Sequence, residues 1–448
     1  MVILGLGSNM GDRLAHLRLA WQIISAIPDL IVKQVSPVYL SDALLPENAA
    51  DDWNQPYLNL ALKIETKLEP LDLLHRLKKI EIDIGRKPAK RHWGPRIIDI
   101  DILAWDDVII KEDALTVPHS SLQERPFALW PLADIAPQWK FPLEGPYHQK
   151  TAAQIVEQWG SRFSGEAPFH TRQLYQRIDT PQLIGVINVT PDSYSDGGQA
   201  FDPDHALQQA LSLVEAGATI LDIGAEATSP RASLIDSKTE WQRLEPVLTR
   251  IHAARSEFCV VPIISVDTRR AEIAEKALAQ GADWINDVTG LDDVRMREVL
   301  LSSNADCIVM HHLSIPASDD DNLPRDQDPA SLVYAWAKKR IDELVKQGIK
   351  REKIIFDPGI GFGKMAEQSL LLLQHAQVFK SLGVRVLIAH SRKRFHALFT
   401  NKPAHERDIE TATAAVYLAN QTSVDYLRVH NVEMCARALR MNAALFPQ

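Results

Sequence analysis

The 448-residue sequence predicts two domains, an N-terminal α+β domain of the ferredoxin-like class and a C-terminal α/β TIM barrel, (β/α)8. The length suits two or three domains rather than one. Strand and helix patterns in the first third follow the order β-α-β-β-α-β, which is typical of the ferredoxin-like fold. From residue 183 onward, eight apolar strand patterns alternate with helical patterns, which fits a closed barrel better than an open sheet.

The expected N-terminal elements follow one another closely. A strand over 2–7 precedes a helix that Ser8 or Asn9 is expected to cap, since both side chains accept hydrogen bonds from free N–H groups. Two strands, a helix with Pro at its start and Gly near its end, and a fourth strand are then predicted over 32–40, 57–65, 70–85 and 97–103. A hairpin and a Pro-rich helical piece are expected within 104–150.

The segment 161–178 loses this periodicity. Its first part, GSRFSGEAP at 160–168, is small and polar, which is typical of a linker. We therefore expect the first domain over 1–160, the linker over 161–178 and the barrel over 179–448.

The barrel strand patterns share one feature, because each begins with apolar residues and ends with a polar one. Examples are VPIISVDT at 261–268 and WINDVTG at 284–290. Active sites of such barrels lie at the C-terminal ends of the strands. A purely structural barrel has no reason to place unlike polar groups at nearly every strand end, so the pattern predicts an active site there.

The composition excludes several function classes. The net charge of −9 argues against a broad surface that binds nucleic acid or an anionic membrane. Three widely spaced cysteines indicate a reducing compartment without a disulfide framework. The sequence has no apolar run of membrane-spanning length, and its N-terminus lacks the pattern of a signal peptide. We expect a cytoplasmic protein.

The stretch HWGPRIIDIDIL at 92–103 contains the first candidate site. Alternate side chains of a strand lie on opposite faces, so Asp99 and Asp101 share one face while Ile98, Ile100 and Ile102 share the other. Two adjacent carboxylates repel each other unless a cation lies between them. They either point into water or hold a metal.

This stretch follows GSN at 7–9 and YLN at 57–59 and precedes LTVPHSSLQERPFALWPL at 115–132. With these motifs, residues 1–150 resemble 6-hydroxymethyl-dihydropterin pyrophosphokinases. The resemblance implies that Asp99 and Asp101 bind two Mg²⁺ ions and take part in catalysis with Arg96 and Trp93. It also implies ATP contacts for Arg86, Arg96, His119 and Arg125, and pterin contacts for Tyr57, Asn59 and Phe127. The chain departs from the family pattern at Pro88, where the family has an arginine.

The second half resembles dihydropteroate synthases through NVTPDSYSDGG at 188–198 and the segments LDIGAEATSP, SVDT, INDV, DPGIGFGK, SRK and RVH. The resemblance implies a pterin site formed by Asp267, Asn286, Met310, Asp357, Phe362 and Lys393, with Asp267 and Lys393 also taking part in catalysis. It implies p-aminobenzoate contacts for Thr228, Pro230 and Ser391. Pyrophosphate contacts are implied for Asn188, Arg428 and His430, with Asn188 also binding one Mg²⁺. The chain departs from the family at Ser229, Arg231 and Asn431.

Together the two resemblances predict a bifunctional enzyme of folate biosynthesis. It would transfer pyrophosphate from ATP to 6-hydroxymethyl-7,8-dihydropterin and then join the product to p-aminobenzoate. A homodimer through the barrel is implied by the second family, and no nucleic-acid or membrane partner is expected. Two alternatives remain open: a pterin-binding methyltransferase barrel, and an active kinase fused to a degenerate pterin-binding barrel.

Overall fold

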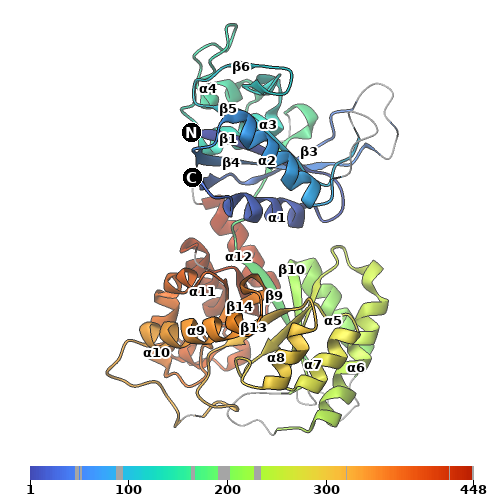
Figure 1. Cartoon of the computed structure of the whole chain (residues 1–448), viewed down its shortest axis with the longest axis vertical. Helices are drawn as coiled ribbons and strands as arrows, with labels where there is room; N and C mark the ends of the chain where they lie inside the picture. Colours follow the sequence, from blue (N-terminus) through green and yellow to red (C-terminus); the bar gives the residue numbers. More distant parts are fainter. Residues whose placement is uncertain are drawn as a thin grey trace. The chain divides into compact units, whose positions relative to one another are not determined.

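A computed structural model describes residues 1–45, 50, 53–86, 94–162, 167–189, 202–226, 234–318, 320–422 and 424–445. The chain divides into two compact units, Met1–Asp179 with Arg440–Gln448, and Thr180–Leu439 (Figure 1). No helix among the described residues is both long and apolar enough to cross a membrane. We describe each unit by itself.

The first unit contains a mostly antiparallel sheet with the strand order β5-β1-β4-β3-β8, to which β2 adds by pairing with β4. Its principal strands are β1 (Val2–Ser8), β2 (Leu30–Val35), β3 (Val38–Ser41), β4 (Tyr57–Thr66), β5 (Asp99–Trp105) and β8 (Arg172–Leu174). Its principal helices are α1 (Arg13–Ser25), α2 (Pro70–Asp83), α3 (Pro126–Ile135) and α4 (Ala152–Val156). A small hairpin joins β6 (Ile110–Lys111) to β7 (Thr116–Val117). This arrangement confirms the ferredoxin-like prediction.

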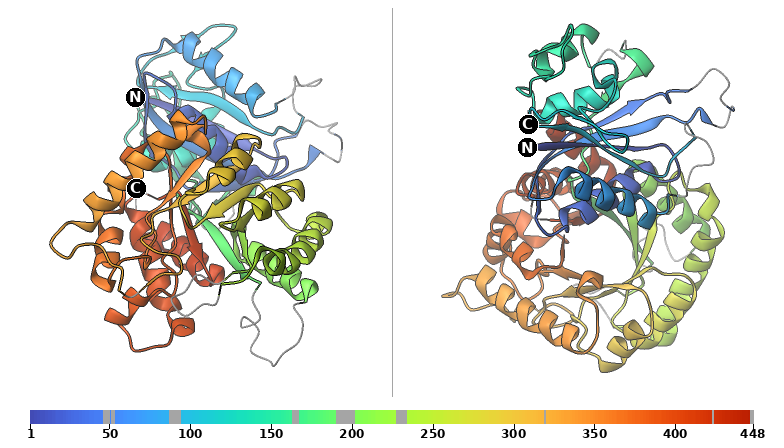
Figure 2. Two further views of the ribbon diagram at one scale, coloured as in Figure 1. Left: turned by 60° about the horizontal axis from the view of Figure 1, so that its bottom comes forward. Right: turned by 45° about the horizontal axis from the view of Figure 1, so that its top comes forward.

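The two faces of this sheet differ in what covers them. Helices α1 and α2 cover one face, where Leu4, Leu6, Ile100 and other apolar side chains form a buried core (Figure 2). On the opposite face, α3 packs on Ile3 and Leu103 in a second core that contains Trp130. Asp99 and Asp101 therefore lie on the face opposite their neighbouring isoleucines, as the alternation of the strand predicts.

Two local predictions in this unit were wrong. The cap of α1 is Asp12, whose carboxylate accepts from the Ala15 backbone N–H at 3.0 Å, rather than Ser8 or Asn9. The single strand expected over 32–40 is divided at Ser36 and Pro37, because proline has no N–H to donate to the sheet. The Ser36 hydroxyl accepts from the Ala61 N–H at 2.8 Å and keeps the interrupted ladder satisfied.

The expected linker also differs from the structure. Within 161–178, Arg172–Leu174 form β8, which pairs antiparallel with β3 through Leu40↔Arg172, Tyr39↔Gln173 and Val38↔Leu174. The first unit extends to Asp179. This strand was not predicted, because three residues are too few to produce a visible alternation. The small polar residues at 160–168 before it are typical of a linker.

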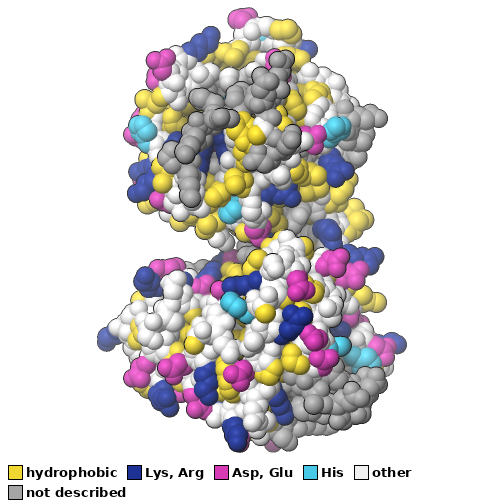
Figure 3. Space-filling model, turned by 90° about the vertical axis from the view of Figure 1, so that its right-hand side faces the viewer, with side chains coloured by type: hydrophobic (Ala, Val, Ile, Leu, Met, Phe, Trp, Pro, Cys, Tyr) yellow, Lys and Arg dark blue, Asp and Glu magenta, His cyan; other side chains and the backbone are white. Residues whose placement is uncertain are grey.

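The second unit is a closed barrel of eight parallel strands, as predicted. The strands are β9 (Gln182–Asn188), β10 (Ala218–Gly224), β11 (Ile263–Asp267), β12 (Trp284–Asp287), β13 (Asp306–Met310), β14 (Ile354–Asp357), β15 (Arg385–Ile388) and β16 (Tyr426–Val429). The α-helices are α5 (Pro203–Ala216), α6 (Ser237–Ala253), α7 (Ala271–Ala279), α8 (Val294–Leu301), α9 (Pro329–Lys346), α10 (Ala366–Gln374), α11 (Asp408–Asn420) and α12 (Val432–Leu445). Acidic and basic side chains are intermixed on the face of this unit that Figure 3 shows, as expected for solvent-facing sides of amphipathic helices.

The barrel interior is built in layers along the strands. Side chains that include Ile220, Trp284, Ile355 and Tyr426 form an apolar layer inside the barrel. Because the strand period is two, the next inward-facing positions lie two residues further on. In β10, β12, β14 and β16 these positions are Asp222, Asn286, Asp357 and Arg428. A polar layer thus lies above the apolar one, toward the C-terminal ends of the strands.

Candidate active sites

The first site is a pocket of about 560 Å³ in the N-terminal unit. It brings together nine residues that the sequence predicted: Tyr57, Asn59, Arg86, Arg96, Asp99, Asp101, His119, Arg125 and Phe127. Trp93 and Pro88 lie outside the described residues. The prediction missed Ser41, Asp42 and Lys78, which also line the pocket.

Strand β1 forms an open floor for this pocket. Gly5 pairs with Asp101 and Gly7 pairs with Asp99, so β1 places no side chain beside either carboxylate. A Cβ atom at Gly7 would lie 3.0 Å from Asn59 Oδ1 and 3.5 Å from Tyr57 Cδ1. Glycine at these positions keeps room for a ligand between the carboxylates and the aromatic end of the pocket.

Basic side chains surround the aspartate pair. Arg86 Nη1 lies 2.8 Å from Asp99 Oδ1, and Arg96 also forms an ion pair with Asp99. Lys78 Nζ lies 3.5 Å from Asp101 Oδ1. Burial alone would raise the pKa of Asp99, but Arg96, Lys78 and Arg86 outweigh it and hold this pKa below its ordinary value. Asp99 is therefore ionised at neutral pH.

Helix α2 fixes Lys78 and Glu81 against the free edge of β5. Glu81 Oε1 accepts from the Ile100 N–H at 2.7 Å, and Lys78 Nζ donates to the Ile100 carbonyl at 3.0 Å. These bonds satisfy backbone groups that an edge strand leaves unpaired. The same contacts hold the Lys78 ammonium beside the carboxylates.

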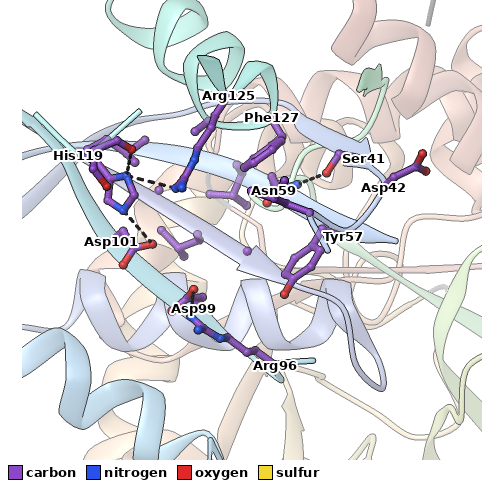
Figure 4. Close-up of a pocket in the computed structure, with 18 of the residues that line it drawn as sticks. Ser41, Asp42, Tyr57, Asn59, Arg96, Asp99, Asp101, His119, Arg125 and Phe127 are labelled. Atoms are coloured by element: carbon purple, nitrogen blue, oxygen red, sulfur yellow. Dashed lines mark hydrogen bonds and ion pairs between the residues drawn. The ribbon is translucent and has the colours of Figure 1, made fainter. Parts of the chain in front are cut away.

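The aromatic end of the pocket is formed by β4 and α3. Tyr57 and Asn59 alternate along β4 and so share a face, while Pro126 at the first position of α3 fixes the helix start that presents Phe127. Asn59 lies between Tyr57 and Phe127 (Figure 4). Asn59 Nδ2 donates to Ser41 Oγ at 3.0 Å, which leaves Oδ1 to accept a hydrogen bond from a ligand.

At the opposite end of the pocket, His119 links Arg125 to the aspartate pair. Its Nδ1 lies 3.5 Å from Arg125 Nη1, and its Nε2 lies 3.9 Å from Asp101 Oδ2 (Figure 4). Arginine and histidine at this place, with Lys78 and Arg86 nearby, form a site suited to phosphate oxygens.

Metal fit can be judged from the donor set. The described residues contain no group of three or more His, Cys, Asp or Glu side chains able to hold a metal ion. Asp99 and Asp101 supply two carboxylates, so a cation between them needs further oxygen ligands. Mg²⁺ usually takes one or two carboxylates and completes its shell with phosphate oxygens and water, which fits this pair.

The second site lies at the C-terminal ends of the barrel strands. Its centre is Asp222, which the sequence analysis did not single out. Asp222 Oδ2 accepts from Asn286 Nδ2 at 2.9 Å and from Arg428 Nε at 2.6 Å, while its Oδ1 accepts from Ser265 Oγ at 2.5 Å. The alternation in LDIG could have revealed it, because Asp222 follows inward-facing Ile220 by two residues.

Arg428 joins Asp222 to Asp267. Its Nη2 lies 3.2 Å from Asp267 Oδ2. Burial, followed by repulsion from Asp222, raises the pKa of Asp267 to about 7, and Arg428 only partly opposes this. The resemblance assigns Arg428 to pyrophosphate, and in the structure its guanidinium lies between the carboxylates of Asp222 and Asp267.

Lys393 lies between Phe362 and the acidic groups. Its Nζ lies 4.5 Å from the centroid of the Phe362 ring. Burial and then Arg428 lower the pKa of Lys393 to about 8, while burial raises the pKa of Asp357 to about 6. Phe362 and Met310 belong to one apolar cluster beside these groups. Lys393 and Asp357 can therefore change charge near physiological pH.

The segment after β14 depends on glycine and on Lys364. A Cβ at Gly359, which has φ +65°, would lie 1.9 Å from the His311 carbonyl oxygen. Lys364 Nζ contacts His311 Nδ1 at 2.8 Å, the Phe362 carbonyl at 2.8 Å and the His311 carbonyl at 3.2 Å. Lys364 thus holds the backbone of Phe362 against the end of β13. The sequence analysis did not single out this lysine.

The remaining predicted residues lie at neighbouring strand ends. Ser391 Oγ contacts His430 Nδ1 at 2.9 Å, which joins a residue predicted for p-aminobenzoate to one predicted for pyrophosphate. Asn188 is the exposed last residue of β9. Thr228, Ser229, Pro230 and Arg231 lie outside the described residues. Asn431 donates to Asp408 Oδ2 at 2.8 Å, where a second carboxylate would be repelled.

Comparison with known proteins identifies both units. Residues 3–137 match the family described as 7,8-dihydro-6-hydroxymethylpterin-pyrophosphokinase, and residues 184–430 match the family described as pterin binding enzyme. A "Folate synthesis bifunctional protein" of Chlamydia caviae is 35% identical over 447 residues, covering 98% of this chain and 96% of the relative. The chain belongs to the bifunctional folate synthesis proteins.

Other relatives agree with this family. A folate synthesis bifunctional protein of Arabidopsis thaliana is 33% identical over 482 residues, covering 99% of this chain and 96% of the relative. The dihydropteroate synthase of Anaplasma phagocytophilum, solved with bound 6-hydroxymethylpterin-monophosphate, is 36% identical with a TM-score of 0.54, covering 60% of this chain and 100% of that one. The Xanthomonas albilineans synthase, solved with 4-aminobenzoic acid, is 33% identical with a TM-score of 0.55, covering 60% and 94%.

This bifunctional folate synthesis protein therefore has a pyrophosphokinase unit and a dihydropteroate synthase unit. The relatives favour the predicted function over both alternatives, the methyltransferase barrel and the degenerate barrel, since related chains carry the same two units over nearly their full length.

Proposed function

We propose that the pocket beside Asp99 and Asp101 binds ATP at its basic end and 6-hydroxymethyl-7,8-dihydropterin at its aromatic end. The pterin hydroxyl oxygen attacks the β-phosphorus of ATP, loses its proton, and displaces AMP. The observation that supports this proposal most directly is the union of two carboxylates, several cations and an aromatic pair over a glycine floor. Phosphoryl-type transfer needs mainly alignment and charge neutralisation, which such a site supplies.

The proposal assigns two Mg²⁺ ions to Asp99 and Asp101. When bound, Mg²⁺ supplies positive charge to the transferred phosphates. Arg86, Arg96 and Lys78 form ion pairs with the two carboxylates and lie where they would also meet phosphate oxygens of bound ATP. Arg125 and His119 bind the ATP phosphates, and Asn59 Oδ1 accepts from an N–H of the pterin edge.

For the barrel, we propose that Asp267, Asn286, Asp357 and Lys393 bind the pterin ring, with Phe362 and Met310 as apolar walls. The amine of p-aminobenzoate attacks the pterin methylene carbon, the bond from that carbon to the diphosphate oxygen breaks, and the amine loses a proton. Arg428, His430 and Asn188 receive the departing pyrophosphate, with one Mg²⁺ at Asn188. Thr228, Pro230 and Ser391 bind p-aminobenzoate.

A coupled assay tests both assignments. Full-length protein with Mg²⁺, ATP, hydroxymethyl-dihydropterin and p-aminobenzoate should release AMP and form dihydropteroate, and omission of Mg²⁺ should abolish both products. Formation of AMP without dihydropteroate would favour a degenerate barrel. Asp101→Asn should remove AMP formation while leaving synthesis from added pterin diphosphate intact.

We also propose a homodimer through the barrel and a cytoplasmic location. Exposed apolar side chains on and near α11 support the dimer, among them Ile409, Tyr417 and Phe399. Light scattering on the purified chain checks the mass, and Ile409→Lys should convert a dimer into a monomer. Three free cysteines agree with a reducing compartment, and fractionation of cells checks the location.

A further inference from the structure

The segment Ala167–Leu174 lies outside both family matches, which end at residue 137 and begin again at 184. It nevertheless belongs to the kinase unit. Strand β8 within it pairs with β3, and β3 leads directly into Ser41 and Asp42, two residues that line the pocket. The segment therefore supports the strand that forms the pterin end of this site.

One backbone hydrogen bond and one side-chain contact hold the segment against that end. The Asp42 N–H donates to the Phe169 carbonyl at 2.8 Å, and His170 Nδ1 lies 2.5 Å from Asp42 Oδ2. Phe169 and His170 have positive φ angles of 61° and 44°, which non-glycine residues rarely adopt. Such conformations persist only where surrounding contacts enforce them, and they concentrate at ligand sites.

The side chain of Phe169 contacts an aromatic wall of the pocket. Its ring packs edge-on against Phe127, with a centroid distance of 5.4 Å and an interplanar angle of 71°. Phe127 is only partly buried and lines the pocket, where a ligand can reach its ring. An edge-on neighbour limits the rotation of Phe127 before any ligand binds, which reduces the entropy lost when a flat ring stacks on it.

We propose that Ala167–Leu174 supports the pterin end of the kinase site from outside the pocket, with Phe169 acting as a positioning residue for Phe127. This inference rests on the proposed role of Phe127 in pterin binding. The same segment supports Asn59 indirectly, since β8 holds β3 and Ser41 of β3 orients the Asn59 amide.

The test compares four variants of the full chain: Phe169→Leu, Phe169→Tyr, Trp159→Leu and Phe127→Ala. Trp159 is the matched control, because it makes a similar edge-on contact in the same unit, at 5.7 Å from Trp130, but its partner Trp130, unlike Phe127, does not line the pocket. The measurements are the KM for hydroxymethyl-dihydropterin, the KM for ATP and kcat, each from AMP release.

Phe169→Leu should raise the pterin KM about two- to tenfold, since an aromatic pair contributes roughly 0.5–1.5 kcal/mol and about 1.4 kcal/mol corresponds to tenfold. The ATP KM should change less than twofold. Phe169→Tyr keeps the ring and should restore the pterin KM, and Trp159→Leu should leave it unchanged even if the protein melts at a lower temperature.

These outcomes distinguish the positioning role of Phe169 from the proposed role of Phe127 in pterin binding. If Phe127→Ala leaves the pterin KM unchanged, the proposed pterin site itself is wrong. If Phe127→Ala raises that KM while Phe169→Leu does not, only the positioning role is overturned. Equal increases in Phe169→Leu and Trp159→Leu would assign the effect to general loosening of the unit and would also overturn the inference.

Discussion

At the scale of single residues, the synthase site is governed by burial of like and unlike charges side by side. Asp222 and Asp267 are both close to Arg428, which cannot neutralise two carboxylates completely. Burial is the main reason that the pKa values of Asp267 and Lys393 move toward neutrality from opposite directions, to about 7 and about 8, with Asp222 adding to the first shift and Arg428 to the second. Groups that change charge in this range are typical of functional sites.

These values predict the pH dependence of the synthase reaction. Asp267 takes up a proton as the pH falls below about 7, and Lys393 loses one as the pH rises above about 8. If the carboxylate and the ammonium are the active forms, kcat/KM for the pterin diphosphate should be highest between these values and fall on both sides. A profile measured with added pterin diphosphate checks this.

Two variants distinguish the titration of Asp267 and Lys393 from that of the substrate, whose phosphate also titrates near neutrality. Asp267→Asn should remove the contribution of Asp267 to the acidic limb and leave that of Asp357, whose pKa is about 6. Lys393→Arg should remove the contribution of Lys393 to the basic limb, because a guanidinium stays protonated. Unchanged limbs in both variants would show that neither Asp267 nor Lys393 sets the pH dependence.

A second prediction concerns the chemical step. If the diphosphate leaves before the amine attacks, positive charge develops at the pterin methylene, and the Asp267 carboxylate can stabilise it. Asp267→Asn should then slow single-turnover synthesis by about 10²-fold or more while weakening pterin binding less than about tenfold. Ser265→Ala, which removes a bond to Asp222 rather than to Asp267, is the control. An unchanged single-turnover rate in Asp267→Asn would refute this role.

Sequence reasoning identified most described site residues because the motifs place them at strand ends, where topology then brings them together. It was weaker where several residue types serve equally well. Asn9 and Asp12 are both good helix caps, and only the structure shows that Asn9 instead accepts from the Arg96 N–H at 2.7 Å. Asp222 was overlooked because it precedes the strand end by two residues and needs the barrel register to place it.

At the scale of elements, the segment that follows β14 determines where Phe362 lies. Positive φ angles at Gly359, Gly361 and Gly363 allow the chain to turn back repeatedly. The contacts of Lys364 with His311 and the Phe362 carbonyl then hold this segment against the end of β13. Burial lowers the pKa of Lys364 to about 7, with Lys393 adding to the effect. The sequence shows the glycines but not the contacts of the lysine, which depend on His311, 53 positions away.

Lys364→Met should therefore impair the synthase selectively. The change leaves two buried carbonyl oxygens without their donor and releases Phe362, so synthase kcat/KM should fall roughly 10–100-fold, as expected for the loss of more than one bond to a charged group. The kinase activity of the same chain should stay within twofold. Lys350→Met, which alters an exposed lysine of the same unit, is the matched control. Equal losses in both variants or in both activities would contradict this role.

At the scale of the whole molecule, each site draws its described residues from a single unit. The kinase pocket lies entirely within Met1–Asp179, and the polar layer of the barrel lies within Thr180–Leu439. The division between units was predictable from the change in pattern near residue 180. The strand at 172–174 was not, because its partner β3 lies more than 130 positions earlier in the chain.

This separation predicts complementation between damaged chains. Asp101→Asn should abolish AMP formation, and Asp267→Asn should slow the synthase, each leaving the other activity within twofold of normal. An equimolar mixture of the two variants should restore coupled dihydropteroate synthesis, with a lag while pterin diphosphate accumulates in solution. A mixture that stays inactive although each partner retains its intact reaction would contradict free exchange of the intermediate.

The glycine floor of the kinase pocket bears on how resistance to an inhibitor would arise. A flat compound resting on Gly5 and Gly7 touches main chain rather than a replaceable side chain. An alanine at Gly7 would push against Asn59 and Tyr57, the two residues that we propose bind the pterin. A mutation of Gly7 that gave resistance to such a drug would therefore also impair the enzyme's own reaction and lower folate production.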